Sequence, residues 1–90
     1  MRMLMFSIYD MKAMVYLVPF PARSDVDAKR QIAASFDNPQ MKETPIAKHP
    51  EDFRLMRLGT FDDESGIMTC EQPQHVADIV ALATPGTVLS

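Results

Sequence analysis

The chain has 90 residues, of which 47% are apolar, and it carries a formal net charge of −3 at pH 7. The apolar fraction and the presence of only three glycines exclude a disordered chain, and the acidic balance excludes a generic basic surface for phosphates. A chain of this length is expected to form one domain over residues 1–90 and to bury roughly 60–65% of its unfolded surface, so a homo-oligomer is expected to add burial.

The single cysteine, Cys70, indicates an intracellular protein, because a small secreted domain normally carries several cysteines in disulfides. Ser7 and Asp10 interrupt the apolar start of the chain, and no small-residue cleavage site follows, so we expect no signal peptide. No segment approaches the roughly 18 apolar residues of a membrane helix. We therefore expect a soluble protein inside the cell with no membrane partner.

Alternating apolar residues predict two antiparallel strands at the start of the chain, over residues 3–10 and 13–20. The two residues between them suit a tight hairpin in length, although they lack the Asn-Gly sequence that such turns prefer. Pro19 and Pro21 are predicted to end the second strand, because proline cannot donate a hydrogen bond to a neighbouring strand.

The next segment has the signals of a helix. Ser24 is a typical N-cap whose hydroxyl can accept from the amide of residue 27, and Asp25 and Asp27 favour the positive end of the helix dipole. The sequence Asp37-Asn38-Pro39 is predicted to end the helix. Residues at helical spacing form one apolar stripe, made of Val26, Ile32, Ala33 and Phe36.

The sequence of the second half of the chain predicts an irregular connection, two strands and a short helix. Residues 38–52 contain three prolines and are predicted to be irregular. A strand over residues 53–61, with Phe53, Leu55 and Phe61 on one side, leads through a polar turn to a short strand over residues 67–70. Residues 74–83 have the spacing of a helix that Pro85-Gly86 ends.

The predicted order is β-β-α-β-β with a C-terminal helix as an option, which is typical of an α+β fold with the helix packed on one face of a small antiparallel sheet. The second face of this sheet is rich in methionine, and one helix cannot cover both faces. We expect a dimer interface or the C-terminal segment to cover it. The residues expected at the oligomer interface are Met3, Met5 and Met14.

The side chains that can bind metals do not form a recognised ligand motif. The candidates show neither C-x-x-C nor H-E-x-x-H spacing, so we expect no metal and no cofactor. The sequence from His49 to Asp52 is more typical of a turn that begins a strand. The candidates are His49, Glu51, Asp52, Cys70 and His75.

No arrangement of residues predicts an enzyme. Asp62-Asp63-Glu64 lacks the pattern of a calcium loop and is expected to be a solvated turn. Cys70 lies in a short apolar segment and is expected to be a small core residue. The serines have no catalytic motif around them, and no glycine-rich loop for phosphates is present.

Nucleic-acid binding requires a local patch, because all nine Lys and Arg residues lie within the first 57 residues. Strict alternation places Arg54 and Arg57 on opposite faces of one strand. Aromatic side chains can stack on single-stranded bases, although they can equally be core residues beside cations that only confer solubility. The candidate nucleic-acid-binding residues are Arg23, Lys29, Arg30, Arg54, Arg57, Tyr9 and Tyr16.

Residues 48–66 read KHPEDFRLMRLGTFDDESG, and this segment resembles the small nonstructural protein of the gokushovirus branch of Microviridae, which are tailless bacteriophages with circular single-stranded DNA genomes. Further similar pieces bring the resemblance to about residues 7–66. They are Ser7–Ala13, Pro19-Phe20, residues 28–36 and Asp37-Asn38-Pro39.

The resemblance implies a DNA-binding nonstructural protein that acts in replication or packaging of single-stranded viral DNA in the host cytoplasm, with viral replication or capsid proteins as further partners. In the shared segment, Pro50 is expected to direct the chain into the strand, Gly59 to mark a β-bulge and Gly66 to close the turn. The alternative is a homo-oligomeric interaction module, in the simplest case a homodimer, without direct DNA contact.

Overall fold

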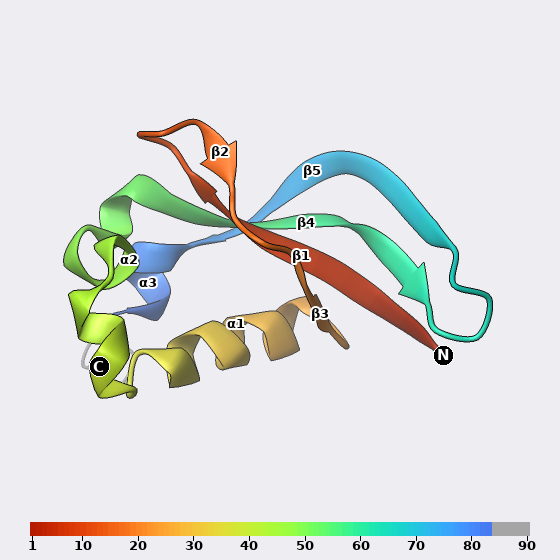
Figure 1. Cartoon of the computed structure of the whole chain (residues 1–90), viewed down its shortest axis with the longest axis horizontal. Helices are drawn as coiled ribbons and strands as arrows, with labels where there is room; N and C mark the ends of the chain where they lie inside the picture. The colour runs from red at the N-terminus through yellow and green to blue at the C-terminus, as the bar shows by residue number, and fades with distance from the viewer. Residues whose placement is uncertain (84–90) are drawn as a thin grey trace.

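The protein is an α+β fold built on one five-stranded antiparallel sheet, as shown by a computed structural model that describes residues 1–83 (Figure 1). The order across the sheet is β2-β1-β4-β5, and β3 pairs with β1 beside β2. The strands are β1 (Arg2–Asp10), β2 (Val15–Tyr16), β3 (Phe20–Ala22), β4 (Phe53–Asp62) and β5 (Met68–Asp78). The α+β class predicted from the sequence is therefore confirmed, whereas the order of elements differs from the predicted one.

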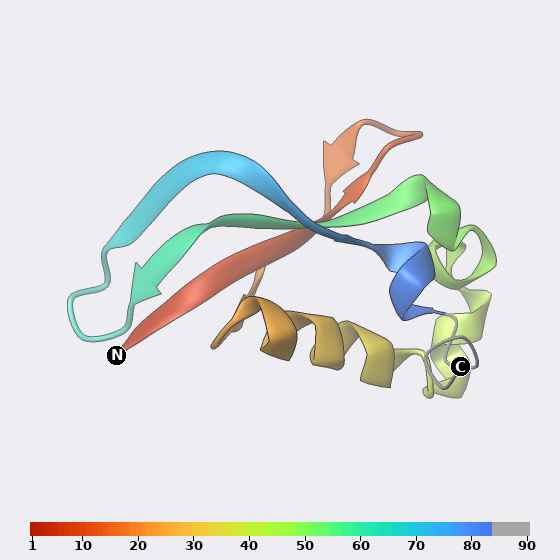
Figure 2. The same ribbon diagram turned by 180° about the vertical axis from the view of Figure 1, so that it is seen from behind.

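The helix α1 (Asp25–Ser35) lies along one face of the sheet, and the two opposite views agree on this arrangement (Figure 1 and Figure 2). The shorter helical elements gather beyond one end of the sheet. They are the 3₁₀ turns η1 (Pro39–Glu43) and η2 (Pro50–Asp52) and the helices α2 (Pro45–Lys48) and α3 (Ile79–Leu82). Within residues 1–83, no helix has the length and apolar character needed to span a membrane. The predicted stop at Pro85-Gly86 lies outside the described residues.

The start of α1 follows the prediction. The Ser24 hydroxyl accepts from the amide of Asp27 at 3.1 Å, and the Asp27 carboxylate accepts from the amide of Arg23 at 3.0 Å. The backbone amide of Arg23 lowers the pKa of Asp27. The apolar stripe is only partly as predicted, because Val26 is exposed whereas Ala28 and Ile32 are buried.

The buried core is small and joins α1, the sheet and α3. The members from the sheet come from both halves of the chain, so the core forms only when β1 and β4 pair. The buried apolar residues are Phe6, Ala22, Ala28, Ile32, Phe53, Leu55 and Ile79.

The prediction of one continuous second strand over residues 13–20 is wrong. The Asp10 carboxylate accepts from the amides of Lys12 and Ala13, and Met14 adopts φ 61°, so residues 11–14 form a turn. Strand pairing then lasts only for Val15 and Tyr16, and it resumes at β3. β3 contains Pro21, which an edge strand tolerates because no partner needs its missing N–H.

The prediction of a helix over residues 74–83 is also wrong for most of that range. β5 continues to Asp78, and the helix is limited to α3. His75 pairs with Met56, and Ala77 pairs with Leu55. Pairing with the long strand β4 therefore overrides the local helical spacing, as tertiary context often does.

A β-bulge at Gly59 changes which side chains of β4 share a face. Phe6 pairs with Arg57 but Met5 pairs with Gly59, so β4 has one extra residue there. Phe61 consequently pairs with Met3 and lies on the face opposite that of Leu55, which corrects its predicted side. The predicted bulge itself is confirmed.

Candidate nucleic-acid interface

Three of the predicted nucleic-acid-binding residues form one row across the sheet. Tyr9 of β1 pairs with Tyr16 of β2 on one side and with Arg54 of β4 on the other. Directly paired residues in antiparallel strands point to the same face. We call Tyr16, Tyr9 and Arg54 the tyrosine row.

The tyrosine row lies on the face opposite α1. Ile8, next to Tyr9 in β1, packs against the buried core beneath the sheet, and strand alternation turns Tyr9 to the other face. The two tyrosine rings lie with their centroids 4.6 Å apart and their planes at 46°. Tyr16 is 44% exposed, so the pair presents an accessible aromatic surface.

Hydrogen bonds fix the backbone beside the row. The Leu17 amide donates to the carbonyl of Ile8 at 2.8 Å, and the Ser7 hydroxyl donates to the carbonyl of Leu17 at 2.6 Å. Ser7 is fully buried, so the second of these bonds is shielded from water. The backbone directly after Tyr16 is therefore anchored to β1 at Leu17 before any ligand arrives.

Arg54 has a weak ionic partner. Its Nε lies 3.9 Å from Oδ1 of Asp78, the next residue in the same row. The same oxygen of Asp78 lies 2.8 Å from Nε2 of His75. The guanidinium is about half exposed and remains accessible to an external anion.

Arg57 lies on the other face and holds elements together. Its Nη1 donates to both carboxylate oxygens of Asp25, at 3.0 and 2.9 Å, and its Nε lies 3.6 Å from Glu71. Hydrogen bonding to Asp25 raises the pKa of Arg57 above its already high ordinary value. Arg54 and Arg57 thus point to opposite faces, as alternation predicted.

The other predicted cations do not join the tyrosine row. Lys29 and Arg30 belong to α1, on the far side of the sheet, and Arg23 lies between β3 and α1. The structure therefore brings together Tyr9, Tyr16 and Arg54 from the candidate set and separates them from the remaining four cations.

An exposed apolar segment borders the row and was missed from the sequence. Residues 14–18 are five consecutive exposed apolar residues, from Met14 at 74% to Val18 at 86% exposure. No sequence signal indicates this exposure, because the same alternation is typical of a paired, half-buried strand. Val15 and Tyr16 are exposed because they form an edge strand of only two residues, and pairing in this strand ends after Tyr16.

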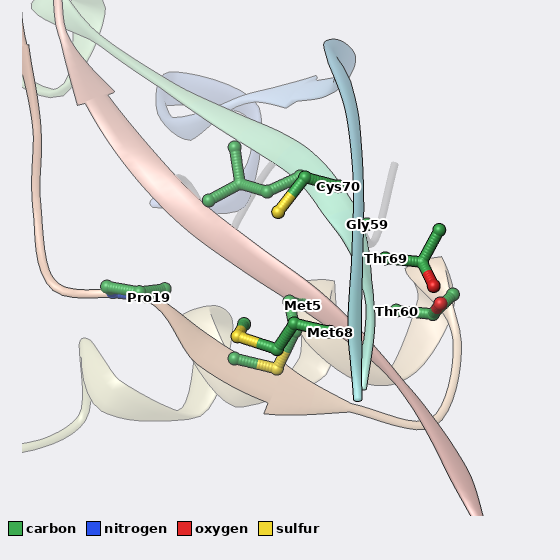
Figure 3. Close-up of a pocket in the computed structure, with 8 residues that line it drawn as sticks. Met5, Pro19, Gly59, Thr60, Met68, Thr69 and Cys70 are labelled. Atoms are coloured by element: carbon green, nitrogen blue, oxygen red, sulfur yellow. The ribbon is translucent and has the colours of Figure 1, made fainter. Parts of the chain in front are cut away.

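Of the predicted oligomer-interface methionines, Met3 and Met5 are two residues apart in β1 and share a face of the sheet, whereas Met14 lies apart from them. Met5 lines an apolar hollow of about 70 Å³ over Gly59, together with Pro19, Met68 and Cys70 (Figure 3). Met14 lies in the turn at the opposite end of β1. Cys70 is exposed, which corrects the prediction that it belongs to the core. The structure does not test the oligomer interface.

The two acidic segments have different surroundings. Asp62 accepts from the amide of Glu64 at 3.0 Å, a bond that lowers the pKa of Asp62 and that is typical of a solvated turn. The second segment, at η2, brings one ligand atom each of His49, Glu51 and Asp52 within 4.8 Å of one another. Within residues 1–83, this is the group whose donor set fits a metal ion.

Comparison with known families decides the wider assignment. Residues 3–82 match the family model described as Phage ORF5 protein. The chain belongs to the Phage ORF5 protein family. The match spans almost all of the described residues, and it makes this chain a bacteriophage protein, as the resemblance implied. No curated protein and no solved structure matches the chain significantly.

The matched residues of this Phage ORF5 family member include the tyrosine row, the hollow over Gly59 and the group at η2. All three sites therefore lie inside the family domain. The family match does not assign the chain to the gokushovirus branch, and it does not show that the chain binds DNA.

Proposed function

We propose that this Phage ORF5 family member is a nonstructural accessory protein that binds single-stranded DNA through the tyrosine row. In this proposal it acts in replication or packaging of a single-stranded phage genome in the host cytoplasm, and it binds without catalysing a reaction. The observation that carries the proposal is the row of Tyr16, Tyr9 and Arg54 on a sheet face that α1 leaves open.

Stacking supplies the affinity in this proposal. A base stacked on an aromatic side chain contributes about 1–3 kcal/mol, independent of sequence. Single-stranded RNA is bound in a comparable way by sheets that carry aromatic residues on one face. The bases of duplex DNA are already stacked on each other, so the tyrosine row favours a single strand.

Electrostatics makes a smaller contribution. The chain has a net charge of −3, and Arg54 is the cation within the row. A protein that neutralises Z phosphates of a single strand shows a salt slope of about −0.7Z. We therefore expect a slope of about −0.7 to −1.4, which corresponds to one or two phosphates.

Fluorescence anisotropy with a labelled single-stranded oligonucleotide tests the proposal. Tyr16→Ala should weaken binding by about 10-fold because one stacking platform is lost. Arg54→Ala should weaken binding less and should bring the salt slope closer to zero by about 0.7.

Arg30→Ala is the charge-matched control, because it removes one positive charge from the helix side of the sheet. It should leave the affinity close to that of the unmodified protein. Absence of binding, or an equal loss in Arg30→Ala and Tyr16→Ala, would refute the proposed interface.

The second candidate function is a homo-oligomeric interaction module, which contacts a second copy or a viral replication or capsid protein. The hollow beside Met5 and Met68 favours it, because apolar surface of this kind is typical of protein contacts. Light scattering that gives a monomer at micromolar concentration would count against the self-association.

A further inference from the structure

We propose that His49, Glu51 and Asp52 bind one divalent transition-metal ion, of which Zn²⁺ is the test case, and that the charge of this ion cancels that of the two carboxylates beside the tyrosine row. We call these three residues the turn cluster. The metal site stands independently of DNA binding, whereas the role of its charge rests on the proposed function.

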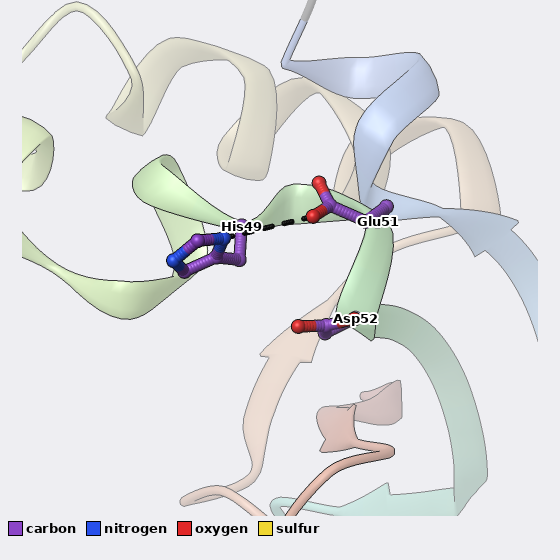
Figure 4. A group of neighbouring side chains, drawn as sticks. All are labelled: His49, Glu51 and Asp52. Atoms are coloured by element: carbon purple, nitrogen blue, oxygen red, sulfur yellow. Dashed lines mark ion pairs between the residues drawn. The ribbon is translucent and has the colours of Figure 1, made fainter.

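The geometry of the turn cluster suits a metal ion (Figure 4). Nδ1 of His49 lies 3.6 Å from Oε2 of Glu51, and one ligand atom from each of the three residues lies within 4.8 Å of the others. Ligands about 2.0–2.2 Å from a shared ion lie roughly 3–4 Å apart. Small rotations of the exposed His49 and Glu51 side chains are enough to close this difference.

The 3₁₀ turn explains why His49 and Asp52 lie close together. Residues i and i+3 of a 3₁₀ turn eclipse each other, so His49 and Asp52 lie on the same side of η2. A search for known spacings misses the cluster, because H-x-E-D is a ligand set only when the backbone adopts this turn.

Backbone hydrogen bonds hold the turn in place. The His49 amide donates to the carbonyl of Pro45 at 2.8 Å, and the Asp52 amide donates to the carbonyl of His49 at 3.0 Å. The Met11 amide donates to the carbonyl of Asp52 at 2.9 Å, which ties η2 to the end of β1. The backbone that carries the three ligands is therefore already ordered before an ion binds.

The charges of the turn cluster call for a cation. Its two carboxylates lie close together, and no Lys or Arg among residues 1–83 is within ion-pair distance of either one; the ionic partner found there is His49. Asp25 and Asp78, by contrast, each have an arginine partner. One imidazole nitrogen and two carboxylate oxygens match transition-metal ions better than Mg²⁺ or Ca²⁺.

The position of the turn cluster links it to the tyrosine row. Asp52 directly precedes β4 and is two residues before Arg54, a separation of roughly 7 Å along a strand. Asp10 and Phe53 pair at the same end of the sheet. A metal ion held by three protein ligands keeps coordination positions open on the solvent side, where a phosphate oxygen can bind.

Isothermal titration of the full chain with ZnCl₂ tests the site. We expect one Zn²⁺ per chain, and at least about 10-fold weaker binding in each of His49→Ala and Asp52→Asn. His75→Ala is the matched control, because it removes the other histidine of the chain. His75 has one carboxylate neighbour, Asp78, and that carboxylate also lies 3.9 Å from the cationic Arg54. Circular dichroism checks that each variant is folded.

Three outcomes of the titration would overturn the metal site: no uptake by the unmodified protein, unchanged affinity in folded His49→Ala, or loss of the site in His75→Ala. The role of the charge is tested by oligonucleotide binding with and without ZnCl₂. Zn²⁺ should strengthen DNA binding by the unmodified protein but not by His49→Ala.

The metal site and its effect on DNA binding can be refuted separately. If Zn²⁺ binds but DNA affinity does not change, the metal site stands and its role beside the tyrosine row is refuted. If no DNA binds with or without Zn²⁺, the proposed function is refuted, and the titration still decides the metal site.

Discussion

At the scale of single residues, Gly59 shapes the open face of the sheet. Its φ of 157° is rare for residues with side chains, and a Cβ at this position would lie 2.1 Å from the carbonyl oxygen of Thr69. Met5 and Cys70 pair with it from the two neighbouring strands. Because glycine contributes no side chain between them, the hollow of about 70 Å³ opens at this point.

Gly59→Ala should therefore destabilise the fold strongly. The clash is with backbone, which cannot move without breaking the pairing of β4 with β5, so we expect a loss of at least about 3 kcal/mol in the free energy of unfolding. Gly66→Ala is the matched control, because Gly66 has φ 75° but a Cβ added there would meet nothing within 4 Å. It should cost only about 1–2 kcal/mol. Urea denaturation measures both, and equal losses would contradict the steric explanation.

At the scale of elements, Arg57 connects α1, β4 and β5. It donates to Asp25 in the first turn of α1, and it lies within ion-pair distance of Glu71 in β5. Asp25 also lies where the positive end of the helix dipole favours a carboxylate. The ion pair therefore fixes the start of α1 against the sheet.

Arg57→Ala should lower the free energy of unfolding by about 1 kcal/mol, a modest value because the side chain is 32% exposed and solvent screens the ion pair. Arg54→Ala removes the same charge from the same strand, but its contact with Asp78 is long, so its loss should stay below about 0.5 kcal/mol. Thermal or urea unfolding of both variants distinguishes the two roles. A larger loss in Arg54→Ala than in Arg57→Ala would contradict them.

At the scale of the whole molecule, neighbouring exposed apolar side chains occur together in two segments of the described chain. One is the run of residues 14–18, and the other is the hairpin region of Ile67 and Met68 near the hollow. The buried core is small by comparison, as expected for a domain of this length. Self-association through the region of Ile67 and Met68 would bury more apolar surface without covering the tyrosine row.

Met68→Glu should therefore weaken a dimer. Met68 is 52% exposed and lines the hollow, and a contact of this kind can be worth about 2 kcal/mol for each copy. Val26→Glu is the control, since Val26 is 55% exposed but belongs to α1 on the other side of the sheet. Sedimentation equilibrium measures the dissociation constant. An equal effect of the two substitutions would place the contact elsewhere.

Features that depend on near neighbours along the chain could be predicted from the sequence. The Ser24 cap, the bulge at Gly59 and the left-handed turn at Gly66 all follow from the local chemistry of those residues. The α+β class follows from the grouping of strands around one strong helix. The phage origin follows from the segment of residues 48–66, which lies within the family match.

Which distant residues meet is settled by the three-dimensional fold and not by local sequence. The break after Tyr16, the extension of β5 to Asp78 and the side taken by Phe61 all depend on pairing between strands far apart in the chain. The tyrosine row needs the register of three strands. The turn cluster needs the 3₁₀ geometry of η2, which the contact with Met11 of a distant segment holds in place. Local patterns do not encode such pairings, because a shift of one residue in register moves a side chain to the other face.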